Sequence, residues 1–269
     1  MPNTYKTECL VLRRLPFREA DRKIVVLTPG RGKLRLLARG AAKIKSKLAA
    51  HLEPFSCSQI MVAVGKNYDT IAASTLKKKY STLSQSLLKK AWADYVVEIV
   101  DNVTKEEQAD LDIYRLVNDT LEFLDSLAMR TAKDYLSGFM TVAGFVVKLI
   151  SHLGYHPELS NCSVCHKRIS SSGNAFDFTQ GGVICQTCYS DKKNQSNIVP
   201  ITDAAIKLLR FLLTEPFLKI SKLKATKDQL DELKNTIDKF LAYYVEVELK
   251  SVEFIRYLNR QKRKLSSKT

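Results

Sequence analysis

Four cysteines of this 269-residue chain occur as two Cys-x-x-Cys pairs, Cys162 with Cys165 and Cys185 with Cys188. Each pair can place two thiolates on one tight turn, and the length of chain between the pairs is typical of ribbon-type zinc sites. Four cysteines fill all four positions around a tetrahedral ion, so the pattern predicts one structural Zn²⁺ rather than a catalytic one. The alternatives are His166 as a replacement ligand, incidental cysteines and a redox-active pair. We do not expect the redox pair, because the sequence shows no strand-to-helix junction of the kind that thioredoxin-like chemistry needs.

Basic residues are the second group that can do chemistry, and they are concentrated at the two ends of the chain. Residues 1–80 contain 17 Lys and Arg against five acidic residues, residues 256–269 contain six basic residues and no acidic one, and the whole chain has a net charge of +15. This excess predicts a polyanionic partner, either nucleic acid or an anionic membrane surface. The residues that we expect to contact DNA are Arg13, Arg14, Lys33, Arg35, Arg39, Lys43, Lys45 and Lys47.

The segment 39–47 has the greatest weight among these, because its small residues let the backbone approach phosphate while alternate basic side chains reach along it. An ordinary solvated basic face is the alternative reading. Four aromatic residues of this region could stack on bases, although barrel aromatics more often belong to the core: Tyr5, Phe17, Phe55 and Tyr68. Four cations near the cysteines could contact DNA or could simply be solvated: Lys167, Arg168, Lys192 and Lys193. The same two readings apply to the basic tail 256–268.

Catalytic motifs are missing from the sequence. There is no GxxxxGK, GxSxG, HExxH or paired-carboxylate motif, and the four histidines are scattered at 51, 152, 156 and 166. We therefore expect a protein that is not an enzyme.

The N-terminus lacks the apolar core of a signal peptide and the apolar runs are interrupted, so we expect a cytosolic protein without a membrane span. The two cysteines outside the pairs, Cys9 and Cys57, are expected to be buried in strands.

The elements that must position these residues change type near residue 80. Short β-rich runs at 5–14, 23–28, 33–38, 55–64 and 68–73, with a turn signal at 29–32 and a long connection at 39–54, predict a small closed barrel of the oligonucleotide-binding (OB) kind. Apolar stripes at helical spacing then predict helices over 83–99, 111–127 and 132–153, the last two capped by Asp110 and Thr131. Further helices are expected at 202–213 and from 228 to about 258.

The predicted fold is therefore a multi-domain α+β protein. We expect an OB-fold DNA-binding barrel at 1–80, a first helical part at 81–156, the four-cysteine zinc module at 157–197, and a second helical part with a basic tail at 198–269.

The stretch TECLVLRRLPFREADRKIVVLTPGRGKLRLLARGAAKIKSKLAAHLEPF closely resembles the N-terminus of the bacterial RecO family. The matching features are the L-V-L-R-R strand, E-A-D-R, the L-T-P-x-R-G-K-x-R hairpin, A-R-G-A, K-S-x-L and L-E-P-F. The order of barrel, helical domain and four-cysteine insert extends the resemblance over the whole chain.

This resemblance implies a cytoplasmic, nucleoid-associated mediator of DNA repair and recombination. Such a protein binds single- and double-stranded DNA, anneals complementary strands, and helps RecR to load RecA onto strands coated by single-strand-binding protein (SSB), whose acidic, apolar C-terminal tail it also binds. The zinc ligands map to the four paired cysteines, and the DNA contacts map to Arg14, Arg35, Arg39 and the lysines of 43–47. Some family members lack the cysteines, so the metal is not essential to the activity in general.

Two other readings remain open at this point. A translation or RNA-processing factor can also combine a barrel, a zinc module and a basic tail. A metal-dependent nuclease is the enzyme alternative, but the sequence lacks the acidic cluster that divalent-metal chemistry needs.

Overall fold

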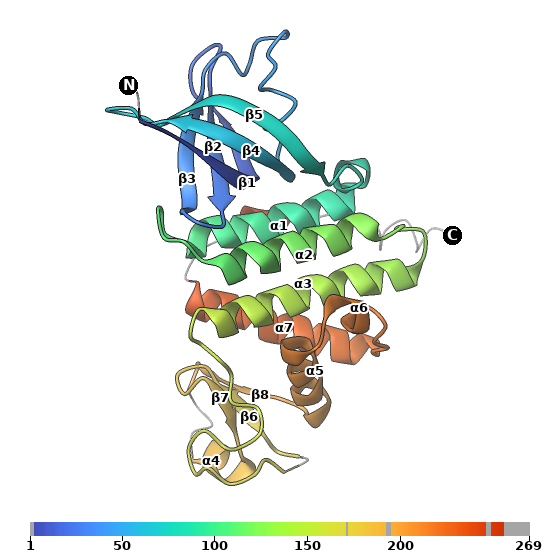
Figure 1. Ribbon diagram of the computed structural model, residues 1–269. Helices are drawn as coiled ribbons and strands as arrows, with labels where there is room; N and C mark the ends of the chain where they lie inside the picture. Colours follow the sequence, from blue (N-terminus) through green and yellow to red (C-terminus); the bar gives the residue numbers. More distant parts are fainter. Residues whose placement is uncertain (1–2, 171, 192–194, 246–248, 256–269) are drawn as a thin grey trace. The chain divides into compact units, whose positions relative to one another are not determined.

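A computed structural model describes residues 3–170, 172–191, 195–245 and 249–255. Contacts divide the chain into two compact units (Figure 1). The first unit contains the described residues up to Leu127 together with those from Leu249 onward, and the second contains the described residues between Ala128 and Glu248.

The first unit begins with five strands. They are β1 (Thr4–Pro16), β2 (Arg22–Thr28), β3 (Gly32–Ala38), β4 (Ser56–Ala63) and β5 (Thr70–Lys79). Their hydrogen-bonded order is β1-β2-β3-β5-β4, and β4 pairs antiparallel with β1, so the sheet closes into a barrel. The β3–β5 seam consists of one parallel pair, Leu37 with Thr70. This is the five-stranded Greek-key arrangement of an OB fold, as predicted.

Strand β1 closes the barrel because it is long enough to pair with both β2 and β4. Its first half pairs with β4 and its second half with β2, with a bulge between Val11 and Arg13. Apolar side chains from all five strands fill the interior, where Val11, Ile24 and Ile60 are almost fully buried. Strand β5 ends six residues beyond the predicted 68–73, because its backbone pairs with β4 as far as Lys79. The sequence does not indicate this extension, since the side chains there are mostly polar and exposed.

A short 3₁₀-helix and two α-helices complete the main part of the first unit: η1 (Leu83–Gln85), α1 (Leu87–Val103) and α2 (Leu111–Ser126). Asp110 caps α2 as expected, since its carboxylate accepts hydrogen bonds from the backbone N–H groups of Asp112 and Ile113. Residues 249–255 return to this unit, where the Glu98 carboxylate accepts hydrogen bonds from the N–H groups of Lys250 and Ser251. Leu249 is not helical, so the predicted helix from 228 to about 258 is not continuous, and its positions 246–248 and 256–258 lie outside the described residues.

The helices of the second unit are α3 (Ala132–His152), α5 (Asp203–Thr214), α6 (Phe217–Ile220) and α7 (Lys227–Tyr244). Helix α3 is long and apolar enough to cross a bilayer by length and composition alone, which the interrupted apolar runs did not lead us to expect. However, 67% of its apolar window is buried inside the protein, where α3 packs against α5, α6 and α7. Its composition is thus explained by its place in the core.

The cysteine-rich insert also belongs to the second unit. It contains β6 (Ala175–Asp177), β7 (Gly182–Ile184), α4 (Gln186–Ser190) and β8 (Ile198–Pro200), with the strands in the order β7-β6-β8. The predicted α+β class, with a barrel, helices and a four-cysteine cluster, is confirmed. The division at residues 80, 156 and 197 stays a prediction, since it follows element type, whereas the two units group α1 and α2 with the barrel by contact.

Candidate metal centre and nucleic-acid interface

The four paired cysteines converge on one point. The sulfurs of Cys162, Cys165, Cys185 and Cys188 all lie within 4.8 Å of one another. Cys185 directly follows β7 and stands at the N-terminal end of α4. The expectation that neither pair lies at a strand-to-helix junction is therefore wrong for the second pair, but this pair faces the first pair within one four-sulfur group. Such a group of four sulfurs can hold one tetrahedral metal ion.

Local hydrogen bonds favour the thiolate form of one of these cysteines, Cys162. Burial raises the pKa of Cys162, but backbone N–H groups of Cys165, Cys185 and Val164 point at its sulfur and bring the pKa down to about 6. Burial and the neighbouring sulfurs raise the pKa of Cys188 to about 12. Four thiolates this close together repel one another, and a bound cation removes that repulsion. His166 adopts a left-handed backbone conformation after the first pair and, among the described residues, is not in the metal-binding group.

An aromatic cluster joins the cysteine module to α7. Phe176 and Phe178 from the module lie edge-on to Phe240 of α7, and the Tyr244 hydroxyl donates to the Phe178 carbonyl oxygen. Burial, together with nearby Tyr243, raises the pKa of Tyr244 to about 12.

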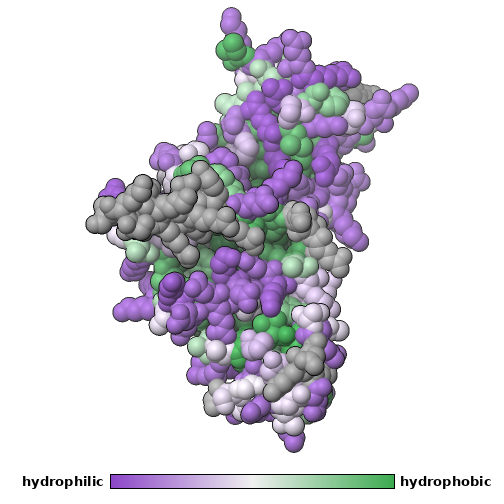
Figure 2. Space-filling model, turned by 180° about the vertical axis from the view of Figure 1, so that it is seen from behind, coloured by the Kyte–Doolittle hydropathy of each residue, from purple (hydrophilic) through white to green (hydrophobic). Residues whose placement is uncertain are grey.

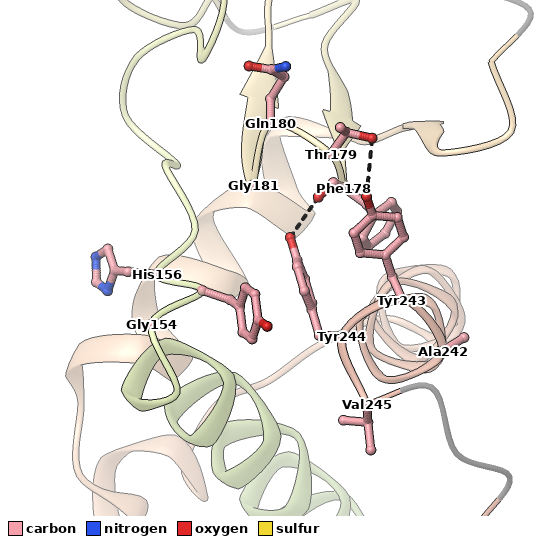
Figure 3. A pocket seen from close by; sticks show the side chains of 11 residues that line it. Gly154, His156, Phe178, Thr179, Gln180, Gly181, Ala242, Tyr243, Tyr244 and Val245 are labelled. Carbon is pink, nitrogen blue, oxygen red and sulfur yellow. Dashed lines mark hydrogen bonds between the residues drawn. The ribbon is translucent and has the colours of Figure 1, made fainter. Parts of the chain in front are cut away.

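Beside this cluster is a cavity of about 860 Å³ (Figure 3). The Tyr155 and Tyr244 rings stack there, with their centroids 4.5 Å apart. The His156 side chain points away from these residues in Figure 3. None of the described lining residues is Lys or Arg. The cavity therefore lacks the charge that a phosphate would need.

In the first unit, four of the cations predicted to contact DNA are engaged with carboxylates. Buried Lys33 lies 3.3 Å from Asp101 of α1, and Arg13 forms an ion pair with the same carboxylate at 3.3 Å. Arg35 pairs with Glu106 and lies 3.8 Å from Asp101, while Arg14 pairs with Glu53 and donates to the Ala41 carbonyl oxygen. No sequence signal points to these partners, since Arg13 and Asp101 are 88 residues apart.

The other four predicted cations are in a different situation. Arg39, Lys43, Lys45 and Lys47 are all exposed. They form no ion pair with any carboxylate in the part of the chain that the structure describes. Their positive charge is thus available to a ligand. As predicted contacts with DNA, all eight cations remain predictions.

The connection between β3 and β4 carries these four cations and is anchored at several points. Leu52 and Ala41 are buried with the barrel core, the Gly40 N–H donates to Asp21, and the Ala42 N–H donates to the Ala20 carbonyl oxygen. Ile44 is fully exposed between two of the lysines. Figure 2 shows a mostly hydrophilic surface over the barrel, with a small hydrophobic spot where this connection projects.

The four aromatic residues that could stack on bases lie in different environments. Phe55 is buried, and Tyr5 packs against the barrel core with the Arg31 guanidinium carbon 3.9 Å from its ring centroid. Phe17 and Tyr68, however, lie together, with ring centroids 5.6 Å apart. The Lys23 ammonium lies over both rings, a contact that the sequence analysis did not foresee.

The remaining candidate contacts lie outside the barrel. Lys167 and Arg168 are exposed beside the cysteine cluster. Lys192, Lys193 and the tail 256–268 fall outside the described residues.

Comparisons with known proteins cover nearly the whole chain. A family model described as "Recombination protein O N terminal" matches residues 1–80, and one described as "Recombination protein O C terminal" matches residues 84–253. Among similar curated proteins, the DNA repair protein RecO of Dehalococcoides mccartyi is 32% identical over 259 residues, which are 96% of this chain and 98% of that protein. The DNA repair protein RecO of Desulforamulus reducens is 29% identical over 93% of both chains, and that of Thermoanaerobacter sp. is 27% identical over 94% of this chain and 97% of its own.

Proposed function

Since this chain belongs to the RecO family, we propose that it works in DNA repair and recombination by binding single- and double-stranded DNA through its barrel. One observation carries the proposal. Four exposed cations without carboxylate partners, Arg39, Lys43, Lys45 and Lys47, stand on one anchored connection of an OB-type barrel. Such a stripe attracts a phosphate backbone by releasing its counterions.

The mechanism that we propose requires no nucleotide hydrolysis. The barrel neutralises the phosphates of one strand while a second surface holds another strand or the SSB-coated substrate, so that complementary strands can approach and anneal. By the family resemblance, RecR, the C-terminal tail of SSB and, indirectly, RecA are the protein partners in the bacterial cytoplasm and nucleoid. Contacts mainly to phosphate should give weak sequence preference and steep salt dependence.

We further propose that the four-cysteine cluster holds Zn²⁺ in a structural role. The proximity of the four sulfurs supports this, since no coordination position is left for water or substrate.

The DNA path is tested by fluorescence anisotropy with a labelled single-stranded oligonucleotide across a salt series. In the test variant, Arg39, Lys43, Lys45 and Lys47 are all changed to Ala. If these side chains release one counterion each, affinity falls and the slope of log K against log salt becomes shallower by about 3. Unchanged binding would place the DNA site elsewhere.

A control variant carries the same change of charge at helix surfaces. It replaces Lys90, Lys207, Lys219 and Lys234 by Ala, because each of these lysines pairs with a carboxylate four residues away in the sequence. This variant should keep the wild-type slope. A slope that falls equally in both variants would mean that overall charge, and not the barrel connection, governs binding.

Two further assays test the alternative functions. Competition between RNA and DNA strands of matched sequence should favour DNA, whereas a clear preference for RNA would indicate the RNA-processing alternative. Prolonged incubation of labelled DNA with Mg²⁺ or Mn²⁺ should give no cleavage, because we propose a mediator and not a nuclease.

A further inference from the structure

Two loops at one end of the barrel bring an aromatic pair together. Phe17 lies in the connection after β1 and Tyr68 in the connection before β5, and their rings meet edge to face at an interplanar angle of 68°. Tyr68 is 46% exposed, which is unusual for a ring that only fills a core. These connections, β1–β2 and β4–β5, are the loops through which OB folds generally contact oligonucleotides.

Cations cover the faces of both rings. The Lys23 ammonium lies 4.4 Å from the Phe17 centroid and 4.9 Å from the Tyr68 centroid, and the Arg18 guanidinium carbon lies 5.4 Å from the Phe17 centroid. Neither cation forms an ion pair with a carboxylate among the described residues. A cation held only by ring faces can exchange them for a phosphate, and the exposed ring face is then open to a base.

The loop that carries Tyr68 is held in place. The Leu37 N–H donates to the Asp69 carbonyl oxygen at 2.8 Å, and the Asp69 carboxylate accepts from the Gly65 N–H at 3.1 Å. A Cβ atom at Gly65 would lie 2.3 Å from the Tyr68 carbonyl oxygen, so only glycine permits this tight turn. The backbone that carries the ring is thus positioned before any ligand binds.

The aromatic pair lies beside the basic connection that follows β3. The backbone bond from Ala42 to Ala20 and the bond from Gly40 to Asp21 tie that connection to the loop of Phe17. A strand whose phosphates follow Arg39 and the lysines after it therefore passes close to the rings.

We propose that Phe17, Tyr68 and Lys23 form a stacking site for unpaired bases of single-stranded DNA. On binding, the Lys23 ammonium moves to a phosphate and a base takes its place on the ring face. Bases in a duplex are already stacked and cannot enter, so the site selects single strands over duplexes. This stacking site rests on the proposed DNA binding, and it specifies the unpaired base as the part of the nucleotide that is recognised.

The test uses two labelled oligonucleotides of equal length, an ordinary single strand and a strand of abasic sites that keeps the phosphates but lacks the bases. Anisotropy at constant salt compares the wild-type protein with a double variant, Phe17→Leu and Tyr68→Leu. We expect the double variant to lose roughly 10- to 100-fold in affinity for the ordinary strand, the range for loss of base stacking. Its affinity for the abasic strand and for duplex DNA should stay within about two-fold of wild type.

Tyr155→Leu is the matched control, because Tyr155 has the same 46% exposure and lies in the other unit. It should bind every probe as the wild type does. Equal losses by the double variant on ordinary and abasic strands, or no loss on either, would overturn the stacking site while leaving DNA binding intact. Wild-type protein that binds neither strand in a salt-dependent way would overturn the proposed function itself.

Discussion

At the scale of single residues, Asp101 is the shared carboxylate partner of three basic side chains. Its carboxylate is buried and lies 3.3 Å from Lys33, 3.3 Å from Arg13 and 3.8 Å from Arg35. The Lys33 ammonium, also buried, additionally donates to the Asp101 carbonyl oxygen. Two buried opposite charges compensate each other's loss of hydration, so each of them needs the other.

Asp101→Asn should therefore destabilise the protein by about 3–5 kcal/mol, because it leaves the Lys33 ammonium buried without a counter-charge. Urea unfolding followed by circular dichroism measures this. Glu106→Gln is the control, since its ion pair with Arg35 is about half exposed on both sides and should contribute no more than about 1 kcal/mol. Equal effects of the two substitutions would show that burial of the Asp101 site is not what matters.

At the scale of elements, the hairpin between β2 and β3 is shaped by a distant segment. Gly32 has a left-handed backbone, and a Cβ atom at this position would lie 1.9 Å from the carbonyl oxygen of Gln108. The next residue, Lys33, accepts the Glu107 N–H at its carbonyl oxygen. The hairpin thus serves as a docking surface for the chain between α1 and α2 as well as a turn.

Gly32→Ala should destabilise the first unit by about 3 kcal/mol or more, because backbone strain adds to a clash with a backbone atom. The shift of the thermal midpoint measures the effect. Gly30→Ala in the same hairpin is the control: its added methyl group meets nothing within 4 Å, so the change should be within about 0.5 kcal/mol. A mild effect at Gly32 would contradict the close approach of Gln108.

At the scale of the whole molecule, chemistry is divided between the two units. The barrel with its excess of positive charge belongs to the first, and the four-cysteine cluster belongs to the second. If the metal is structural, its loss should act within its own unit.

We expect that Cys185→Ser or treatment with a strong chelator removes one Zn²⁺ per chain and increases hydrogen exchange over 157–191, while the affinity for single-stranded DNA changes less than two-fold. Metal analysis and exchange mass spectrometry measure the first two outcomes and anisotropy the third. Cys57→Ser should keep the metal, because Cys57 is a buried barrel residue whose thiol donates to Asn118. Loss of DNA binding with an intact fold would make the cysteine module a contact surface.

Local patterns in the sequence were enough for much of this protein. The short β-rich runs of β1 to β4, the helical stripes of α1 to α3, the caps at Asp110 and Thr131 and the two cysteine pairs all depend on residues near one another in the chain. The family resemblance rests on the same local motifs, which is why it could be stated before any coordinates.

The tertiary structure alone decided which cations stay free. Arg35 and Arg39 are both exposed and only four residues apart in the sequence, yet one meets carboxylates of a distant helix and its following loop and the other does not. Likewise, Phe17 and Tyr68 become a pair only because the barrel brings two loops to one end. Composition determines how much charge a chain carries, but ion pairing and stacking depend on distances between residues far apart in sequence, and only the folded barrel sets those distances.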